Sequence, residues 1–265
     1  MAATQEERRR LSDHDLSRMI ELIKDSDSVE LKLTVPASAQ RKTLAALEID
    51  PLEAQLRQVF FFDTPDLALN KKGVVLRARR VQKKGDDSVV KLRPVIPSEL
   101  PSRVRKSPSF GVEVDAMPGG FVCSGSMKGT PREDVRGTIV GKKPLRGLFS
   151  KEQRAFYAEH APEGVELEGL SVFGPIFVFK LKFAPAGYDR KLVAEMWLYP
   201  DYSRILELST KCATSETFQV AAEARSFLAE RGVELGGDQE TKTKKALEFF
   251  AKELKKQSRG TPAAA

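Results

Sequence analysis

Apolar and charged residues alternate along many short stretches of this chain. In residues 29–35 every second position is apolar, and Glu30 and Lys32 lie between these positions. Side chains of a β-strand point alternately to its two faces, so this spacing predicts strands with one apolar face and one charged face. The pattern recurs farther along the chain at the pairs Arg77/Arg79, Lys91/Arg93, Glu113/Asp115 and Lys180/Lys182, and at Glu195, Glu207 and Lys211. If these strands share one sheet or barrel, their charged side chains form one surface.

Other patterns predict helices around these strands. Apolar residues at helical spacing indicate helices at about 15–24, 38–47, 215–231 and 238–255. Ser150 and Gln153 match a capping box, which predicts a further helix to about residue 160. In the last helix, Leu247, Phe250 and Leu254 form an apolar face that we expect to pack against the strands.

The strand-like runs are numerous and their connections are short. They lie at 29–35, 58–62, around Arg77 and Lys91, and at 110–116, 121–127, 176–183, 191–199 and 204–211. Residues 83–87 have the composition of a hairpin connection, whereas 128–148 is rich in Gly, Pro and basic residues and is interpreted as a long connection. Hairpin-length links and few βαβ units favour a mainly antiparallel α+β fold, a closed barrel with peripheral helices.

Composition narrows the possible partners. The 265 residues are 41% apolar and 31% charged, and no apolar run is long enough to span a bilayer. The first ten residues lack the apolar segment of a signal peptide, so a cytoplasmic location without a membrane partner is expected. Two isolated cysteines, Cys123 and Cys212, argue against a thiolate zinc site. The sequence does not indicate an oligomeric state.

The net charge of +7 is compatible with nucleic acid or with a phosphate-rich small molecule. No basic helix with interleaved aromatic residues and no RNP-like strand is present, and the cations lie next to carboxylates. A nucleic-acid groove does not normally need those carboxylates, whereas phosphate bound through a divalent cation does. Nucleic acid is therefore not the expected partner, and the basic residues of 128–148 are interpreted as solvated.

Each charged strand also has an ordinary explanation. A half-exposed antiparallel strand places polar residues outward, and cross-strand Glu–Lys pairs stabilise it modestly. The recurrence of fixed charge at these positions instead favours strands whose charged faces share one interior. Two cations ~6 Å apart at an effective dielectric constant of ~20 repel each other by roughly 2–3 kcal/mol, so like-charged pairs in a shared interior need neighbouring acids or a bound polyanion.

Six segments also carry a family resemblance. They are S-V-E-L-K (28–32), F-F-D-T-P-D-L-A-L (61–69), G-V-V-L-R-A-R-R (73–80), V-K-L-R-P (90–94), G-V-E-V-D (111–115) and I-L-E-L-S (205–209). With them the chain resembles the CYTH superfamily, named for class IV adenylyl cyclases and thiamine triphosphatases and also called triphosphate tunnel metalloenzymes. The D-T-P-D-L turn followed by R-x-R is the most specific part.

The resemblance implies an eight-stranded antiparallel tunnel that holds a triphosphate and Mg²⁺ or Mn²⁺. It assigns phosphate binding to Arg77, Arg79, Lys91, Lys180 and Lys182, metal binding to Glu30, Glu195 and Glu207, and catalytic roles to Lys32, Glu113 and Asp115. Arg93 and Lys211, which lie on the same charged faces of the predicted strands, are also expected to bind phosphate. Ser28 and Ser209 stand where the family has acidic residues, so each signature acid pair is halved. Residues 124–129 are interpreted as a loop that could bring Lys128 close to the tunnel.

The expected organisation is an N-terminal segment with a short helix (1–27), a tunnel domain (28–256) and a disordered tail (257–265). The expected function is metal-dependent hydrolysis of a triphosphate, either inorganic tripolyphosphate or an organic triphosphate. Two alternatives remain open at this point: an adenylyl cyclase that uses the same tunnel, and a non-catalytic polyphosphate or nucleotide sensor, suggested by Ser28 and Ser209.

Overall fold

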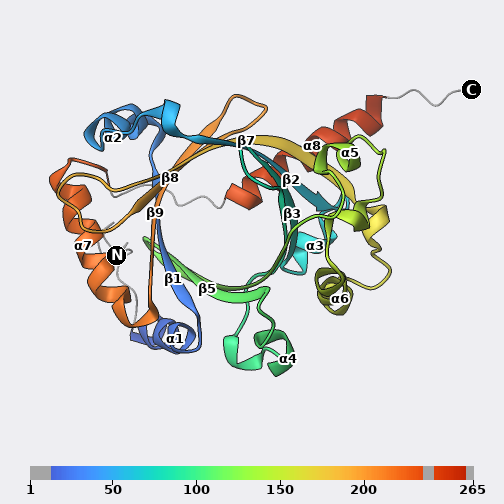
Figure 1. Cartoon of the computed structure of the whole chain (residues 1–265), viewed down its shortest axis with the longest axis horizontal. Coiled ribbons are helices and arrows are strands. Elements are labelled where there is room, and N and C mark those ends of the chain that lie inside the picture. Colours follow the sequence, from blue (N-terminus) through green and yellow to red (C-terminus); the bar gives the residue numbers. More distant parts are fainter. Residues whose placement is uncertain (1–12, 235–241, 261–265) are drawn as a thin grey trace, which may run out of the picture.

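The computed structural model describes the backbone of residues 13–234 and 242–260 and the side chains of 15–234 and 242–256. Its strands close into one barrel, seen nearly along its axis in Figure 1. The strands are β1 (Ser28–Val35), β2 (Gln55–Asp63), β3 (Val74–Val81), β4 (Asp87–Leu92), β5 (Phe110–Met117), β6 (Gly120–Gly129), β7 (Ser171–Phe183), β8 (Leu192–Leu198) and β9 (Arg204–Cys212). Around the barrel they follow the order β1-β5-β6-β4-β3-β2-β7-β8-β9, and β9 pairs back with β1.

The predicted closed barrel with peripheral helices is confirmed, with two differences in detail. The described part of the chain contributes nine strands to it rather than eight, and one pair of neighbouring strands is parallel. β1 and β5 are parallel, whereas the other neighbouring strands are antiparallel. The parallel pair brings Glu30 beside Asp115 in register. Two acids that are 85 positions apart in the sequence therefore lie side by side.

Helices surround the barrel (Figure 1). They are α1 (Asp13–Lys24), α2 (Gln40–Ala46), α3 (Ala68–Lys71), α4 (Ser102–Arg105), α5 (Val135–Ile139), α6 (Lys151–His160), α7 (Thr217–Glu230) and α8 (Lys242–Gly260). The predicted capping box is present at α6, where the Ser150 hydroxyl accepts the Gln153 N–H and the Gln153 side chain accepts the Ser150 N–H. None of the described helices is both long and apolar enough to cross a bilayer.

Two predicted boundaries need correction. Segment 128–148 is not a plain connection, because β6 extends to Gly129 and α5 and a 3₁₀ turn (Leu145–Leu148) follow. Val135 and Leu148 of this segment are fully buried in the core, while its basic side chains are exposed. The backbone of α8 continues to Gly260, beyond the start of the predicted tail, and the remaining tail lies outside the described residues. Residues 238–241, the predicted start of the last helix, also lie outside them.

Most helices cover the outer faces of the strands. Phe156 of α6 packs with Leu76 of β3, and Phe227 of α7 packs with Leu208 of β9. Burial of such side chains stabilises the fold by roughly 1.5–3 kcal/mol each. Because the apolar residues of the strands point outward to these helices, the alternating charged residues point inward.

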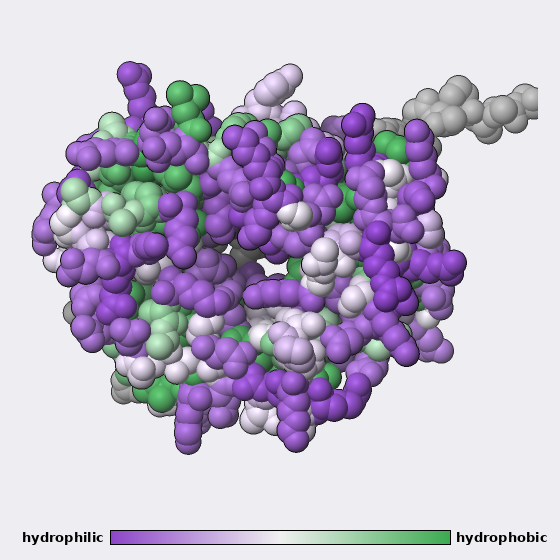
Figure 2. Space-filling view, in the orientation of Figure 1, coloured by the Kyte–Doolittle hydropathy of each residue, from purple (hydrophilic) through white to green (hydrophobic). Residues whose placement is uncertain are grey.

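Helix α8 packs differently. Its Leu247 clusters with Val59, Phe61 and Trp197, which lie on the inward rows of β2 and β8. Phe250 and Leu254 pack against the same cluster, as the apolar face of this helix predicted. The start of α8 therefore borders the barrel interior. Figure 2 shows a hollow at the centre of this view, bordered mainly by hydrophilic residues.

Candidate functional site

The barrel encloses a cavity of about 520 Å³ with a strongly charged wall. Among the described residues that line it, eleven are cationic and six are carboxylates, an excess of five positive charges. The cations are Lys32, Arg57, Arg77, Arg79, Lys91, Arg93, Lys128, Lys180, Lys211, Lys242 and Lys244, and the acids are Glu30, Asp87, Glu113, Asp115, Glu195 and Glu207. Charged residues that are scattered along the sequence thus converge on one interior, which suits a polyanion.

Every sequence-predicted site residue lines this cavity except Lys182. Lys180 pairs in register with Glu195 and points inward, whereas Lys182 pairs with Val193, two residues farther along β7. The Lys182 side chain is exposed and lies outside the cavity wall. The strand alternation that groups these two lysines is correct, but β7 continues past the cavity before it reaches Lys182.

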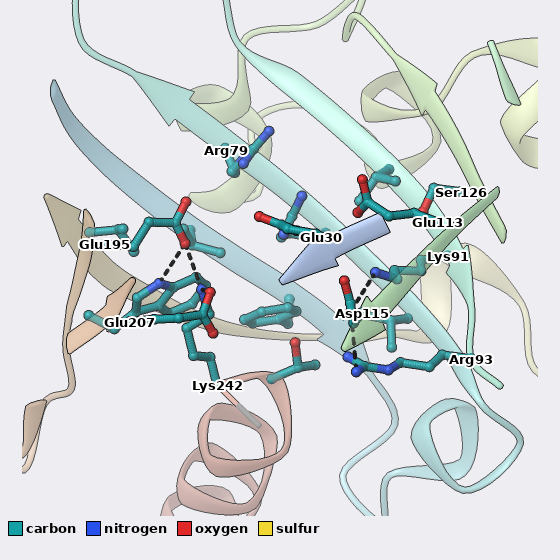
Figure 3. Close-up of a pocket in the computed structure, with 18 of the residues that line it drawn as sticks. Glu30, Arg79, Lys91, Arg93, Glu113, Asp115, Ser126, Glu195, Glu207 and Lys242 are labelled. Atoms are coloured by element: carbon teal, nitrogen blue, oxygen red, sulfur yellow. Dashed lines mark hydrogen bonds and ion pairs between the residues drawn. The ribbon is translucent and has the colours of Figure 1, made fainter. Parts of the chain in front are cut away.

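One group of charges centres on a buried carboxylate. We call Glu30, Lys32, Lys91, Arg93 and Asp115 the Asp115 cluster (Figure 3 labels all of these except Lys32). The Lys32 ammonium lies 3.0 Å from a Glu30 oxygen and 2.7 Å from an Asp115 oxygen. Arg93 and Lys91 approach the other Asp115 oxygen at 3.3 and 3.8 Å. Asp115 itself is 0% exposed, so it orients three cations within the wall of the cavity.

These contacts shift the pKa values of the cluster. Burial alone would raise the pKa of Asp115, but Lys32, Lys91 and Arg93 lower it below its ordinary value. Burial alone would lower the pKa of Lys32, but the charges of Asp115 and Glu30 raise it. Lys91 is farther from Asp115, and burial lowers its pKa to about 8. Asp115 and Lys32 therefore form a fixed ion pair, whereas Lys91 titrates just above neutral pH.

Local backbone geometry places Arg93 in this cluster. Its N–H donates to the Gly73 carbonyl at 2.8 Å, where β3 begins beside the end of β4. A Cβ on Gly73 would lie 2.5 Å from the Arg93 carbonyl oxygen, and Gly73 has a φ of +74°. Only glycine permits both this close approach and this dihedral without strain.

The D-T-P-D turn is a structural element beside the cavity. The buried Asp63 carboxylate accepts the N–H groups of Thr64, Leu69 and Asn70, at 2.7–3.0 Å. These bonds satisfy backbone N–H groups in the first turn of α3 and fix the backbone of Asn70, which lines the cavity. The D-T-P-D turn therefore shapes the wall of the cavity, whereas the R-x-R that follows it supplies Arg77 and Arg79 to the site.

A second group of charges joins β7, β8, β9 and α8. We call Lys180, Glu195, Trp197, Glu207 and Lys242 the Glu195 cluster (Figure 3 labels its two acids and Lys242). The Lys242 ammonium lies 2.6 Å from Glu195 and 2.7 Å from Glu207. Lys180 contacts the other Glu195 oxygen at 2.9 Å, and the Trp197 indole N–H donates to Glu195 at 3.1 Å. Burial alone would raise the pKa of Glu195, but Lys242 and Lys180 hold it well below its ordinary value.

A row of arginines on β2 and β3 forms a third part of the wall. Arg79 makes two bonds of 2.7 Å to Asp87, a bidentate pair. The neighbouring Arg77 has a buried Nε without a hydrogen-bond partner. Burial and the charge of Arg79 lower the pKa of Arg77 to about 9, which leaves the guanidinium charged at neutral pH. A buried donor without a partner is costly, so Arg77 is a position at which an anion would be bound.

The carboxylates also suit a divalent cation. Glu30, Glu113 and Asp115 each offer an oxygen, and these atoms lie within 4.8 Å of one another. Mg²⁺ and Mn²⁺ prefer such oxygen ligands, so this donor set fits the metal that the fold family implies. The predicted metal ligands Glu195 and Glu207 lie apart from this set, in the Glu195 cluster. Ser209, at a position where the family has an acid, donates to Glu30 at 3.0 Å.

The sequence pattern does not predict four charged cavity residues, which are Arg57, Asp87, Lys242 and Lys244. Arg57 precedes the run that was read as a strand, yet β2 begins at Gln55 and places Arg57 inward with Val59. Asp87 was assigned to a hairpin connection but opens β4 and pairs with Arg79. Lys242 and Lys244 lie on a helix, outside the strand alternation that identified the others. Lys128 does reach the cavity, as expected, but from strand β6 rather than from a loop.

No family model and no curated protein matches this sequence. Solved structures do share its fold. One is a candidate adenylate cyclase from Bacillus halodurans, which is 12% identical, with a TM-score of 0.56 and coverage of 83% of this chain and 97% of that chain. Another is HpAC1 from Hippeastrum, a candidate adenylyl cyclase described as having a dominant triphosphatase activity. It is 18% identical, with a TM-score of 0.52 and coverage of 80% and 91%.

At such low identity these likenesses establish the fold. They span most of this chain and nearly all of each solved structure. The barrel fold that the sequence predicted is therefore one that these solved structures share.

Proposed function

We propose that this chain, which shares the tunnel fold of the CYTH superfamily, binds a triphosphate inside its barrel together with Mg²⁺ or Mn²⁺ and hydrolyses a phosphoanhydride bond. The observation that carries the proposal is the cationic excess of the cavity wall, with the buried and unpartnered Nε of Arg77 in that wall. Surface ion pairing does not require such an excess, whereas a bound polyanion neutralises it.

The positions of the cations suggest from which side each would bind the phosphate oxygens. Arg77 and Arg79, fixed on β3, would bind phosphate oxygens from one side, and Lys91, Arg93, Lys180 and Lys211 would bind them from the others. Lys182 is left out because its side chain lies outside the cavity. These positions are set by strand register, so the protein organises its positive charge before the substrate arrives. Catalysis of phosphoryl transfer depends mainly on such positioning and electrostatic stabilisation.

In the reaction, a water oxygen attacks the terminal phosphorus while the bond from that phosphorus to the bridging oxygen breaks. The leaving diphosphate group keeps the electron pair of that bond and takes up the proton that the water loses. Lys32, held between Glu30 and Asp115, would stabilise the negative charge on the reacting phosphoryl group. Glu113 is half-buried in the wall and would orient the attacking water, while Asp115 would position the cations.

A divalent ion held by Glu30, Glu113 and Asp115 would supply further positive charge to the phosphate oxygens. Of the two acids that the halved pairs retain, Glu30 belongs to this donor set and Glu207 lies in the Glu195 cluster. Mg²⁺ commonly uses one or two protein carboxylates together with water and substrate phosphate, so the loss of an acid at Ser28 and Ser209 is compatible with metal binding.

The cavity favours simple triphosphate chemistry over adenylyl cyclisation. The aromatic side chains among its described lining residues are Phe61 and Trp197, which are 1% and 5% exposed. The Lys242 ammonium also covers the Trp197 ring, at 5.0 Å from its centroid. Neither ring offers an open face on which an adenine could stack.

An assay of products tests the proposal against its two alternatives. Purified protein is incubated with tripolyphosphate, thiamine triphosphate or ATP, with Mg²⁺ or Mn²⁺, while phosphate, pyrophosphate and cyclic AMP are measured. Release of phosphate is expected, whereas cyclic AMP from ATP would favour the cyclase. Binding without any product would favour a sensor, and a large gain in rate in Ser28→Glu would then indicate an enzyme weakened by loss of that acid.

A further inference from the structure

Glu195 and Glu207 face each other across two paired strands. They are direct partners in the register of β8 and β9, and both side chains point into the cavity. Like charges at directly opposite positions of a sheet destabilise it unless a cation lies between them. Carboxylate oxygens are the ligands that Mg²⁺ and Mn²⁺ prefer, so a divalent metal ion is one cation that would fit between them.

A lysine already occupies the position between these two carboxylates. The Lys242 ammonium is 2.6 Å from one and 2.7 Å from the other, and its side chain is 13% exposed. The Trp197 ring covers one side of the ammonium. With the Lys180 contact and the Trp197 N–H bond, Glu195 has both oxygens engaged. A metal ion could bind to this pair only after Lys242 had moved away.

This lysine does not belong to the barrel. Lys242 is the first described residue of α8, whose apolar side chains Ala246 and Leu247 pack against inward residues of β2, β7 and β8. The helix therefore delivers a cation into the cavity from outside the strand ladder. The oxygens of Glu30, Glu113 and Asp115 are also close enough for one ion, and cations contact these acids too, but Lys32 and Lys211 lie on strands of the barrel.

We infer that Lys242 is a tethered cation that takes the place of a divalent ion between Glu195 and Glu207, so that this pair of carboxylates does not bind metal while α8 is packed on the barrel. This inference rests on the proposed function, because Lys242 affects turnover only if the cavity binds and hydrolyses a triphosphate. It makes α8 part of the active-site wall, because the charge opposite the metal site comes from the helix rather than from solution.

Counting bound Mn²⁺ tests this inference without any substrate. Free Mn²⁺ is measured by electron paramagnetic resonance during titration of the whole chain, with folding checked by circular dichroism. Lys242→Met is expected to bind one more Mn²⁺ per chain than the wild type, and Lys242→Arg is expected to bind no more than the wild type. Adding Glu207→Gln to Lys242→Met should remove the extra ion. Lys252→Met is the matched control, since Lys252 is exposed on the same helix and lies outside the cavity.

A second variant keeps the test decisive if Lys242→Met does not fold. Glu207→Gln alone should leave the number of bound Mn²⁺ ions unchanged, because Lys242 already excludes metal from that carboxylate. Loss of one ion in Glu207→Gln, or no gain in a folded Lys242→Met, would overturn the inference. A gain of one Mn²⁺ in Lys242→Met without triphosphate hydrolysis by the wild type would instead contradict the proposed function alone. Hydrolysis by the wild type without that gain would contradict the inference alone.

Discussion

The Asp115 cluster and the Glu195 cluster each join two carboxylates through one ammonium group, but the two ammonium groups come from different places. Lys32 lies on β1, two residues after Glu30, and reaches Asp115 because β1 and β5 are paired. Lys242 lies on α8 and reaches Glu195 and Glu207 only because that helix packs on inward apolar residues. The carboxylates of the Asp115 cluster are neutralised by a lysine of the barrel itself, whereas those of the Glu195 cluster are neutralised by a lysine on a packed helix.

This difference separates a permanent part of the site from one that can be altered by moving α8. Asp115 is completely buried, and its partners are held by strand register and by the Gly73–Arg93 contact. The Glu195 cluster would lose its central cation if α8 were displaced. The two clusters should therefore respond differently to substitution.

The largest effect is expected for Asp115→Asn, on stability. Removing one partner of a buried ion pair costs about 3–5 kcal/mol, and Asp115 faces three cations. Glu207→Gln should cost less, about 1–3 kcal/mol, because Lys242 keeps Glu195 as a partner. Urea unfolding followed by circular dichroism measures both. A larger loss in Glu207→Gln than in Asp115→Asn would reverse the comparison.

Arg77→Ala should produce the largest loss of activity. A positioned donor to the charge of a transition state is worth about 10²- to 10³-fold in rate, and kcat/KM for triphosphate hydrolysis should fall by that factor. Arg80→Ala is the control, since Arg80 bonds to Gln58 outside the cavity and should alter kcat/KM by less than about twofold. Equal losses in both variants would show that the effect does not come from the cavity.

Lys180 and Lys182 provide a matched pair on one strand. A charge-assisted hydrogen bond contributes about 1.5–3 kcal/mol, so Lys180→Ala should lower kcat/KM by about 10- to 100-fold. Lys182→Ala should change kcat/KM by less than about twofold, since its side chain is exposed outside the cavity. Steady-state kinetics of the two variants measure both values. Similar losses in Lys180→Ala and Lys182→Ala would show that both lysines of the alternating pattern bind phosphate, whereas a loss in Lys180→Ala alone would support the observed cavity boundary.

A smaller effect is expected from pH. Burial lowers the pKa of Lys91 to about 8, so its ammonium is charged below pH 8 and becomes neutral above it. Binding of an anion favours the charged form, and KM for the triphosphate should therefore rise by about tenfold between pH 7 and pH 9. Lys91→Arg remains charged over this range, so its KM should stay nearly constant. The same rise in both proteins would assign the titration to another group.

Much of this site could be predicted because its residues obey strand alternation. Arg77, Lys91 and Glu113 stand on inward rows whose apolar neighbours pack outward, and the period of two is visible in the sequence. Arg57 and Asp87 were missed at the ends of strands, where β-propensity is weak and register alone places the side chain.

The remaining features depend on tertiary contacts that leave no local pattern. The grouping of Glu30 with Asp115 results from a parallel pairing of β1 with β5, and Lys242 enters the cavity through packing of α8. Lys182 is the opposite case, a residue that was predicted for the site but lies outside it. The alternation of β7 continues beyond the end of the cavity, so the pattern alone includes this lysine. Sequence pattern therefore indicated which side chains point inward, but not where the cavity ends or which acids share a cation.

Isothermal titration calorimetry with tripolyphosphate tests the central claim most directly, because it asks whether the charges of the barrel interior act together on one polyanion. We predict binding of one tripolyphosphate per chain, with an affinity that falls as salt is raised and falls by at least about tenfold in Arg77→Ala. Absence of binding by the folded wild type, or equal affinity in Arg77→Ala, would contradict the account.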